Sequence, residues 1–315
     1  MARIAVTGAS GFVGSNISAA LELLGHEVIA LTRSAAPLPW TARIVNYDDD
    51  AQLQLALADT DALIHCAIAN DFTRLLEHRD EAYAAYVGLT ERLTRLAVAR
   101  GIPLVFISTD WVMDGTGHLV PESDPGNALN FYGYLKALGE QTVRVLAPET
   151  GAICRIAGVM ARHRLGDSPR AQDVGFGYFV DTLVRQLSVG QPFTVWTGPN
   201  VNQITTPSLA SEVGGQIGRI LDRSLAGTFH LVGDDAVTRM QLAHMACEVF
   251  ELDAGLLREG EPPASELFPA PVPIDSSLGN TQTKQLLGLG PTSLRDLLHA
   301  FRREIETGQV APLTT

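Results

Sequence analysis

Residues 3–33 read RIAVTGASGFVGSNISAALELLGHEVIALTR, and they hold the strongest indication of the fold. An apolar strand ends at Thr7. Three glycines follow, Gly8, Gly11 and Gly14, and a helix is expected to open near the last of them. A second apolar strand, EVIALTR, comes after that helix. This order of strand, glycine loop, helix and strand predicts a βαβ unit with a glycine-rich turn between its first strand and its helix.

The glycine spacing G-x-x-G-x-x-G favours a loop that binds a dinucleotide. Glycine lets the backbone approach a pyrophosphate closely, and the N-terminus of the following helix offers amide donors and the positive end of its dipole. A turn that serves only to pack the strand on the helix is the alternative. Because three glycines at this spacing exceed what packing requires, we favour nucleotide binding.

The alternation continues beyond the loop. Apolar strands are expected at ALIHCA, PLVFIST and GAICRIAG, and helices at 51–58, 80–100 and 132–147. Continuous apolar strands that alternate with helices predict a parallel sheet covered on both faces. We therefore expect an α/β fold, a doubly wound parallel sheet of the Rossmann type, with residues 1–160 as the dinucleotide-binding domain.

The sequence changes character after about residue 160. A polar, turn-rich loop is expected over 161–177, and a proline-dense extended stretch ends near Ser277. Between and after them lie helices predicted over 177–189, 208–223, 238–250 and 293–306, with strands at 193–196 and 227–233. We expect residues 161–315 to form mainly a smaller C-terminal α/β part that binds substrate, with strand 227–233 returning to the main sheet.

The composition of the chain argues against several classes of protein. The chain has 315 residues, 46% of them hydrophobic, and a net charge of −12 without a basic patch, so nucleic acid is not an expected partner. Its three cysteines are far apart and fit neither a disulfide framework nor a zinc site, and no other spacing predicts a metal. No apolar run approaches the roughly 20 residues that cross a bilayer, and the N-terminus enters a strand directly. We expect a cytoplasmic protein.

Residues 130–140, NFYGYLKALGE, place two tyrosines near one lysine. Residues four apart share a helix face and residues two apart do not, so Tyr132 and Lys136 belong together and Tyr134 points away. An ammonium beside a phenol favours the phenolate and lowers the pKa of the tyrosine. On spacing alone, an ordinary helix with a solvated lysine is the favoured interpretation, because the pattern Y-x-x-x-K is common.

The end of the second strand indicates the cofactor. An acidic residue there would bind the ribose hydroxyls of NAD, but this chain has Thr32, Arg33 and Ser34. Arg33 can pair with a 2′-phosphate, which favours NADP over NAD. The alternative is an ordinary surface arginine.

Three motifs in order carry a resemblance to a known family. The glycine loop, the segment ISTDWVMDG at 107–115 and the pattern N-x-Y-G-x-x-K at 130–136 resemble the extended short-chain dehydrogenase/reductase family. The S-T-D-aromatic segment is similar to the dTDP-4-dehydrorhamnose reductase-like branch. Residues 227–243 and 277–298 also look like that branch, so the resemblance covers nearly the whole chain.

The resemblance implies roles for individual residues. Thr109 would hydrogen-bond the substrate carbonyl, with Ser108 as the second choice for that role. Tyr132 would donate the proton, and Lys136 would hold the nicotinamide ribose and lower the pKa of Tyr132. Tyr134 would then be a packing or rim residue. Hydride delivery to a ketone makes an alkoxide that needs this proton near neutral pH.

The expected cofactor site combines the glycine loop, the strand ends and the tyrosine helix. Its residues are Gly8, Ser10, Gly11, Phe12, Val13, Gly14, Arg33, Asn46, Tyr47, Cys66, Ala67, Ile68, Tyr132, Lys136 and Ile156. Arg162, His163 and Arg164 form a basic cluster near the expected substrate entrance. They would meet a phosphate or lie in a solvated loop.

The chain departs from the family pattern at several positions. Thr109 is followed by Asp110 and Trp111, without the glutamate of the dehydratases, which disfavours dehydration. Asp110 would assist protonation or only cap the loop. Tyr86 occupies the position of an asparagine that supports the active-site lysine through water. The adenine-contacting pair is replaced by Asn46 and Tyr47.

The substrate-level motifs also differ. The tryptophan expected after the strand with Arg155 is absent, and 201–213 lacks the R-x-D element for a diphosphate, so the rhamnose precursor itself is not the expected substrate.

The resemblance thus predicts an NAD(P)H-dependent reductase of a small-molecule carbonyl, such as a 4-keto-6-deoxy sugar nucleotide or another polar ketone. One alternative is a non-catalytic NADP-binding regulatory subunit, as in methionine adenosyltransferase, and another is a sugar-nucleotide epimerase. Family members often dimerise through the helices that correspond to 80–100 and 132–147, which is compatible with a homodimer.

Overall fold

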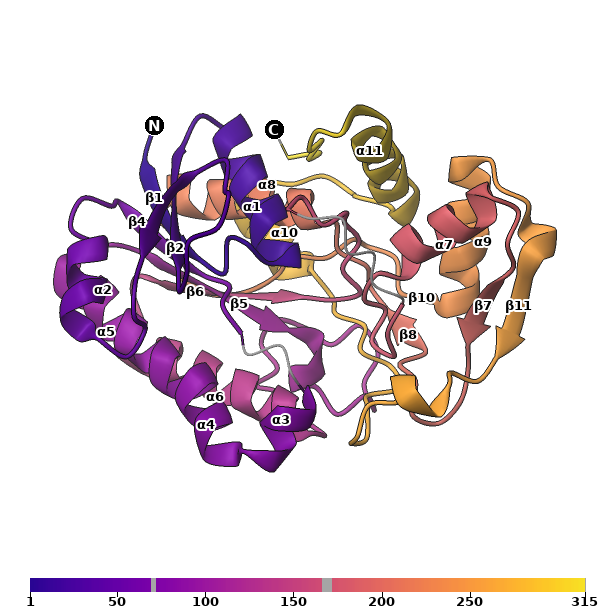
Figure 1. The fold of residues 1–315 in the computed structure, drawn as a ribbon, viewed down its shortest axis with the longest axis horizontal. Helices are drawn as coiled ribbons and strands as arrows, with labels where there is room; N and C mark the ends of the chain where they lie inside the picture. Colours follow the sequence, from indigo (N-terminus) through magenta and orange to yellow (C-terminus); the bar gives the residue numbers. More distant parts are fainter. Residues whose placement is uncertain (69–71, 166–171, 315) are drawn as a thin grey trace.

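A seven-stranded parallel sheet forms the centre of the fold (Figure 1). The computed structural model describes residues 1–68, 72–165 and 172–314, so part of the loop predicted over 161–177 lies outside the described residues. The strand order is β3-β2-β1-β4-β5-β6-β9, and every neighbouring pair is parallel. The strands are β1 (Arg3–Thr7), β2 (Glu27–Thr32), β3 (Thr41–Ile44), β4 (Ala62–His65), β5 (Leu104–Thr109), β6 (Gly151–Ile156) and β9 (Gly227–His230).

Helices cover both faces of this sheet. On one face lie α1 (Phe12–Leu23), α8 (Ala210–Asp222) and α10 (Thr281–Leu287), and on the other α2 (Asp50–Ala56), α5 (Leu89–Arg100) and α6 (Phe131–Leu146). Alternate residues of β1 show the division, because Ile4 packs toward Ile17 of α1 while Ala5 packs toward Leu93 of α5. The predicted doubly wound parallel sheet is confirmed.

The second part of the chain builds its own core beside the sheet. It contains α7 (Phe179–Ser188), α9 (Arg239–Phe250) and α11 (Leu294–Thr307), with β7 (Phe193–Trp196) parallel to β11 (Leu257–Gly260) and β8 (Ile204–Thr205) antiparallel to β10 (Val237–Thr238). The strand predicted over 227–233 lies in the main sheet as β9, beside β6. Helix α8 also packs on the sheet side, against α1. The division of the chain at residue 160 stays a prediction.

The structure differs from the expected elements in several places, among them the short strands β8, β10 and β11, which were not predicted. The helix predicted over 80–100 consists of α4 (Arg79–Tyr83), a π-helical turn at Ala84–Gly88, and α5. The helix expected to open near Gly14 begins at Phe12. Strand β3 was missed because it is a short, mostly exposed edge strand without an apolar pattern. Helices α3 (Phe72–Glu77) and α10 are too short to show a clear helical period.

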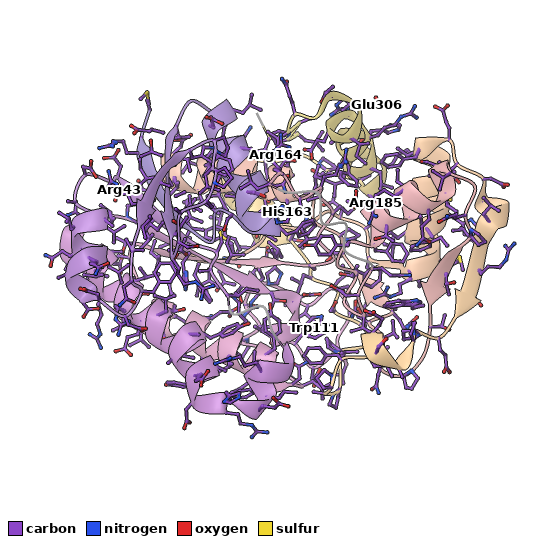
Figure 2. The ribbon with its side chains drawn as sticks, in the orientation of Figure 1. Arg43, Trp111, His163, Arg164, Arg185 and Glu306 are labelled. Atoms are coloured by element: carbon purple, nitrogen blue, oxygen red, sulfur yellow. The ribbon has the colours of Figure 1, made fainter. Side chains whose placement is uncertain are left out.

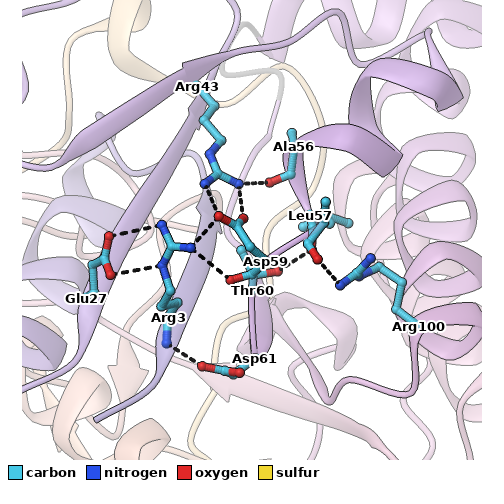
Figure 3. Close-up of polar contacts among 10 residues, drawn as sticks. Arg3, Glu27, Arg43, Ala56, Leu57, Asp59, Thr60, Asp61 and Arg100 are labelled. Carbon is cyan, nitrogen blue, oxygen red and sulfur yellow. Dashed lines mark hydrogen bonds and ion pairs between the residues drawn. The ribbon is translucent and has the colours of Figure 1, made fainter.

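Ion pairs join the amino ends of the sheet strands (Figure 3). Arg3 at the start of β1 pairs with Glu27 at the start of β2 and with Asp59, which precedes β4. Arg43 of β3 also pairs with Asp59, and these contacts hold the pKa of Asp59 below its usual range. This edge of the sheet is therefore occupied by structural contacts.

None of the helices in the described parts of the chain has the length and apolar content needed to cross a bilayer.

Candidate active site

The opposite, carboxyl edge of the sheet opens on a cavity of about 1500 Å³. In doubly wound sheets this edge is where ligands bind. Every residue predicted for catalysis or cofactor binding lines this cavity. They are Gly8, Ser10, Gly11, Phe12, Val13, Gly14, Arg33, Asn46, Tyr47, Cys66, Ala67, Ile68, Thr109, Tyr132, Lys136 and Ile156. The shared cavity brings these residues together, while their individual roles stay predictions.

The three glycines of the loop differ in how closely neighbouring atoms approach them. Gly8 has φ +71° and a Cβ there would lie 2.8 Å from the Ala67 nitrogen, while a Cβ on Gly14 would lie 2.2 Å from the Gly8 oxygen. Packing alone therefore requires these two glycines. A Cβ on Gly11 would lie 3.2 Å from the Gly8 oxygen, and Gly11 is partly exposed at the cavity. At Gly11 the contact is less severe than at Gly8 and Gly14, so packing restricts this position least.

The start of α1 is suited to an anion. Its N-cap residue Gly11 supplies no side-chain cap, and the first turn contains no acidic residue. The first amide groups of a helix lack acceptors within the helix and lie at the positive end of its dipole. The loop and α1 therefore fit a dinucleotide pyrophosphate.

Arg33 follows β2 at the adenosine end of the cavity. Its side chain is exposed and makes no ion pair or hydrogen bond with any residue that the structure describes. The neighbouring Tyr47 hydroxyl donates to the Leu31 carbonyl at 2.8 Å, and burial raises the pKa of Tyr47 to about 12. No described carboxylate competes for the Arg33 guanidinium, which therefore fits a 2′-phosphate.

Helix α6 places Tyr132 beside Thr109. Asn130 caps the helix by accepting the Gly133 N–H at 2.9 Å. Gly133 lets the first turn lie directly on the carbonyl of Trp111, because a Cβ would come within 2.0 Å of that oxygen. The Tyr132 phenol is hydrogen-bonded to the Thr109 hydroxyl. The two hydroxyls to which the family resemblance gives roles in proton donation and carbonyl binding are therefore adjacent.

Lys136 lies on the same helix face but is directed elsewhere. Its buried Nζ donates to the Ile107 carbonyl at 2.5 Å and lies 4.2 Å from the centroid of the Phe106 ring. Burial lowers the pKa of Lys136 to about 8. Burial also raises the pKa of Tyr132 above its usual range. The expected lowering of the Tyr132 pKa by Lys136 is wrong in this structure, because desolvation of the phenol dominates.

Tyr86 replaces the expected asparagine with a bulky, buried ring. It lies in the π-helical turn, is 4% exposed, and meets the Tyr132 ring edge-on at a centroid distance of 6.0 Å. The Tyr86 ring thus fills space next to Tyr132 where the family pattern has a small amide. π-helical turns are often found at functional sites.

The substrate end of the cavity contains residues that sequence reasoning missed. Trp111 meets Tyr132 edge-on at 6.0 Å and Phe268 edge-on at 5.2 Å, measured between ring centroids. Trp111 lies where the two parts of the chain meet (Figure 2). Asp173 and Tyr178 also line the cavity, and the Tyr178 ring lies 4.2 Å from the Phe12 ring of α1, measured between centroids. Phe268 and Asp173 come from irregular segments far along the chain, and no local pattern connects them with Tyr132.

The basic cluster at 162–164 does not line the cavity. Arg164 donates to the Gly308 carbonyl at 2.7 Å, and Arg162 is 3.9 Å from Asp181 (Figure 2 labels His163 and Arg164). The solvated-loop interpretation of this cluster is favoured. Across the described ranges, no group of three or more His, Cys, Asp or Glu side chains is arranged to hold a metal ion.

The contact of Gly133 with Trp111 leads to a first prediction. In Gly133→Ala the new methyl group has to displace the turn that follows β5, since its neighbour is backbone. Overpacking of this kind costs about 1–3 kcal/mol, and urea denaturation should show a lower midpoint. Gly88→Ala is the matched control, because no atom lies within 4 Å of a Cβ there. Equal stability of both variants would contradict the contact.

Comparison with known proteins identifies relatives along the whole chain. A family model described as RmlD substrate binding domain matches residues 2–306. The chain is 30% identical to the probable low-salt glycan biosynthesis reductase Agl14 of Haloferax volcanii, over 94% of this chain and 96% of that protein. It is 26% identical to a dTDP-4-keto-6-deoxy-D-glucose reductase of Streptomyces niveus, over 93% and 90%.

Two further similarities bear on function and fold. The chain is 28% identical to methionine adenosyltransferase 2 subunit beta of Bos taurus, over 81% of this chain and 74% of that protein. The solved structure of dTDP-4-dehydrorhamnose reductase from Bacillus anthracis, in complex with NADP, covers 96% of this chain and 99% of its own, with a TM-score of 0.76 and 20% identity. That structural similarity shows a shared fold.

Proposed function

The chain belongs to the RmlD substrate binding domain family, and from this premise we propose that it is an NADPH-dependent reductase of a carbonyl group on a sugar nucleotide. Family membership agrees with the branch predicted from the sequence motifs. The observation that carries the proposal is the hydrogen-bonded pair of Tyr132 and Thr109 in the same cavity as the glycine loop and Arg33.

Different residues along the cavity bind different parts of the cofactor and the substrate. The backbone amides at the start of α1 hold the pyrophosphate, Arg33 pairs with the 2′-phosphate, and Lys136 holds the nicotinamide ribose. When bound, the cofactor supplies the hydride. Thr109 orients the substrate carbonyl, and Tyr132 gives its proton to the carbonyl oxygen.

The apolar side chains beside Tyr132 and the names of the relatives support the reduction of a carbonyl group. Trp111 and Phe268 form an apolar wall beside Tyr132 that keeps water away from the reacting carbon. Relatives at 26–30% identity are named as reductases of a glycan pathway and of a 4-keto-6-deoxy sugar nucleotide. These names support a sugar nucleotide with a keto group as the substrate class.

Oxidation of NADPH in the presence of a panel of ketones tests the proposal. The panel contains nucleotide-linked keto sugars, free keto sugars and simple polar ketones. We expect oxidation that depends on a nucleotide-linked keto sugar and yields the corresponding alcohol. Binding of NADPH without turnover of any ketone would overturn the reductase assignment.

The preference for NADP over NAD depends on Arg33. A charge-assisted pair with the 2′-phosphate should contribute about 1.5–3 kcal/mol, which is roughly ten- to a hundred-fold in affinity. Arg33→Ala should remove most of that preference and leave NAD binding little changed, because the glycine loop holds the shared pyrophosphate. Titration of both cofactors against both proteins measures this. Arg95→Ala, at an exposed helix arginine, is the control. Equal affinity of the unmutated protein for NAD and NADP would refute the role of Arg33.

A non-catalytic NADP-binding subunit is the second candidate. Tyr86 in place of the asparagine favours it, as does the similarity to methionine adenosyltransferase 2 subunit beta. Such a subunit would bind NADPH with the same Arg33 dependence but reduce no ketone. The ketone panel therefore separates the two candidates.

The homodimer and the cytoplasmic location stay predictions. The homodimer is supported by the exposed apolar side chains Tyr83, Val98, Tyr134 and Val145 on α4, α5 and α6.

A sugar-nucleotide epimerase is the third candidate. An epimerase would return its cofactor to the oxidised starting state, whereas a reductase consumes NADPH with each turnover. The same oxidation assay therefore also tests the epimerase alternative.

A further inference from the structure

Asp110 is a buried carboxyl group that the proposed mechanism does not yet use. It is 5% exposed but still lines the cavity directly after Thr109. No lysine or arginine in the described part of the chain forms an ion pair with it. Its partners are the hydroxyls of Thr109 and Ser276 and the backbone amides at 110 and 111. A carboxylate buried without a cation is costly, so a function is the natural explanation.

A continuous hydrogen-bonded path connects this carboxyl group with the proton donor. The Tyr132 phenol is bonded to the Thr109 hydroxyl, and Thr109 Oγ1 donates to Asp110 Oδ1 at 2.9 Å. Thr109 therefore has one oxygen that can receive a proton from one neighbour and pass its own to the other. Three side chains from β5, the turn after it and α6 form this path.

Two other neighbours of Tyr132 in the described part of the chain, Lys136 and Tyr86, make different contacts. The ammonium of Lys136 is directed at the Ile107 carbonyl and the Phe106 ring. Tyr86 packs its ring edge-on against Tyr132. The side chain that would hold a water near the lysine in the family pattern is therefore an aromatic ring in this chain.

We propose that Asp110 is the proton reservoir that restores the Tyr132 hydroxyl through Thr109 after each reduction. The inference rests on the proposed reductase function. The Tyr132 O–H bond breaks as the substrate oxygen gains the proton. The phenolate then takes the Thr109 proton, and Thr109 takes the proton of the Asp110 carboxyl group. A proton taken up from bulk solvent through the cavity restores the Asp110 carboxyl group, so each reduction consumes one solvent proton. Asp110 acts through Thr109 and is a relay residue.

The electrostatics of the site agree with this path. Burial raises the pKa of Asp110 to about 7, so the carboxyl group holds its proton below that pH and loses it above. Among the other charged groups that line the cavity, Lys136 lies on α6, Asp173 lies in the loop before α7, and Glu266 precedes Phe268. The charges of Asp110 and Asp173 both disfavour a phenolate at Tyr132, which favours its reprotonation. Steady-state reduction should therefore decline as the pH rises through about 7.

The relay predicts a difference between the first turnover and later ones. In Asp110→Asn the Tyr132 proton is present at the start, so a single turnover should proceed at nearly the normal rate. Steady-state turnover should fall by about 10²-fold, the lower end of the range for proton-transfer groups, and should lose its decline near pH 7. Asp114→Asn is the control. Asp114 orders the same segment through Thr116 and Asn127 but lies outside the cavity lining.

A second measurement needs no turnover. Carbon NMR of protein labelled at the aspartate carboxyl groups should show one group that titrates near pH 7, absent in Asp110→Asn and present in Asp114→Asn. The relay is overturned if Asp110→Asn keeps the normal steady-state rate and pH profile while Tyr132→Phe is inactive. In that case the reductase function stands. Absence of reduction by the unmutated protein would overturn both the function and the relay.

Discussion

Replacement of Tyr132 by phenylalanine should remove most of the reductase activity, by about 10²–10⁴-fold, and leave cofactor affinity nearly unchanged. The substitution deletes only the hydroxyl that is hydrogen-bonded to Thr109. The ring contacts with Tyr86 and Trp111 stay, because they involve ring atoms. The loss should therefore appear in kcat, and NADPH titration should give the same affinity for both proteins.

Tyr134→Phe is the matched control for this prediction. Tyr134 is two residues further along the same helix and 52% exposed, so loss of its hydroxyl should leave both kcat and stability unchanged. Similar activity in Tyr132→Phe and the unmutated protein would exclude Tyr132 as the proton donor. A large loss in Tyr134→Phe would show that the helix face has been assigned incorrectly.

The assignment of that helix face is the part of the site that the sequence predicts best. A spacing of four residues determines that Tyr132 and Lys136 share a face, and the structure buries Lys136 while Tyr134 is exposed. The convergence of the glycine loop, Arg33 and Thr109 on one cavity also follows from the sequence. Parallel strands end at the same edge of a sheet, and each of these residues follows or ends a strand.

The features of the site that the sequence does not predict depend on contacts between segments that are far apart in the chain. The acceptor of the Lys136 ammonium is a backbone carbonyl, which no side-chain pattern reports. The requirement for glycine at 133 comes from the Trp111 carbonyl, in a turn that precedes the helix by about twenty residues. The Trp111–Phe268 contact joins segments more than 150 residues apart. The pKa of Tyr132 follows from desolvation, which depends on the whole surrounding fold.

A buried ion pair holds the same helix on the sheet. Glu140 lies one helical turn beyond Lys136, and its side chain is 1% exposed. It accepts two hydrogen bonds from the fully buried Arg155 of β6, at 2.9 and 2.7 Å, and one from Ser108 of β5 at 2.6 Å. Arg155 also donates to the Asp124 carbonyl at 2.9 Å and to Nε2 of His230 in β9 at 3.2 Å.

This network joins α6 to three neighbouring strands. Burial lowers the pKa of His230 to about 3, so its ring is neutral and able to accept the Arg155 N–H, while its Nδ1 donates to the Gly279 carbonyl. Glu140 is therefore the carboxylate that balances the guanidinium at the centre of the network. Its negative charge also favours the protonated form of Lys136. The position of Tyr132 on α6 thus depends on a pair that does not line the cavity.

Glu140→Gln should destabilise the protein by about 3–5 kcal/mol, because it leaves the Arg155 charge buried without its counter-charge. That loss is a large fraction of the stability of a typical domain, about 5–15 kcal/mol, so urea denaturation should show a strongly lowered midpoint. The exposed pair of Glu248 and Arg295 provides the matched control, since Glu248→Gln should cost no more than about 1 kcal/mol. The double variant Glu140→Leu with Arg155→Met removes both charges and should recover much of the loss. If Glu140→Gln is no less stable than Glu248→Gln, the pair does not anchor α6, and the position of Tyr132 must then come from other contacts of the helix, such as that of Gly133 with Trp111 and that of Lys136 with Ile107.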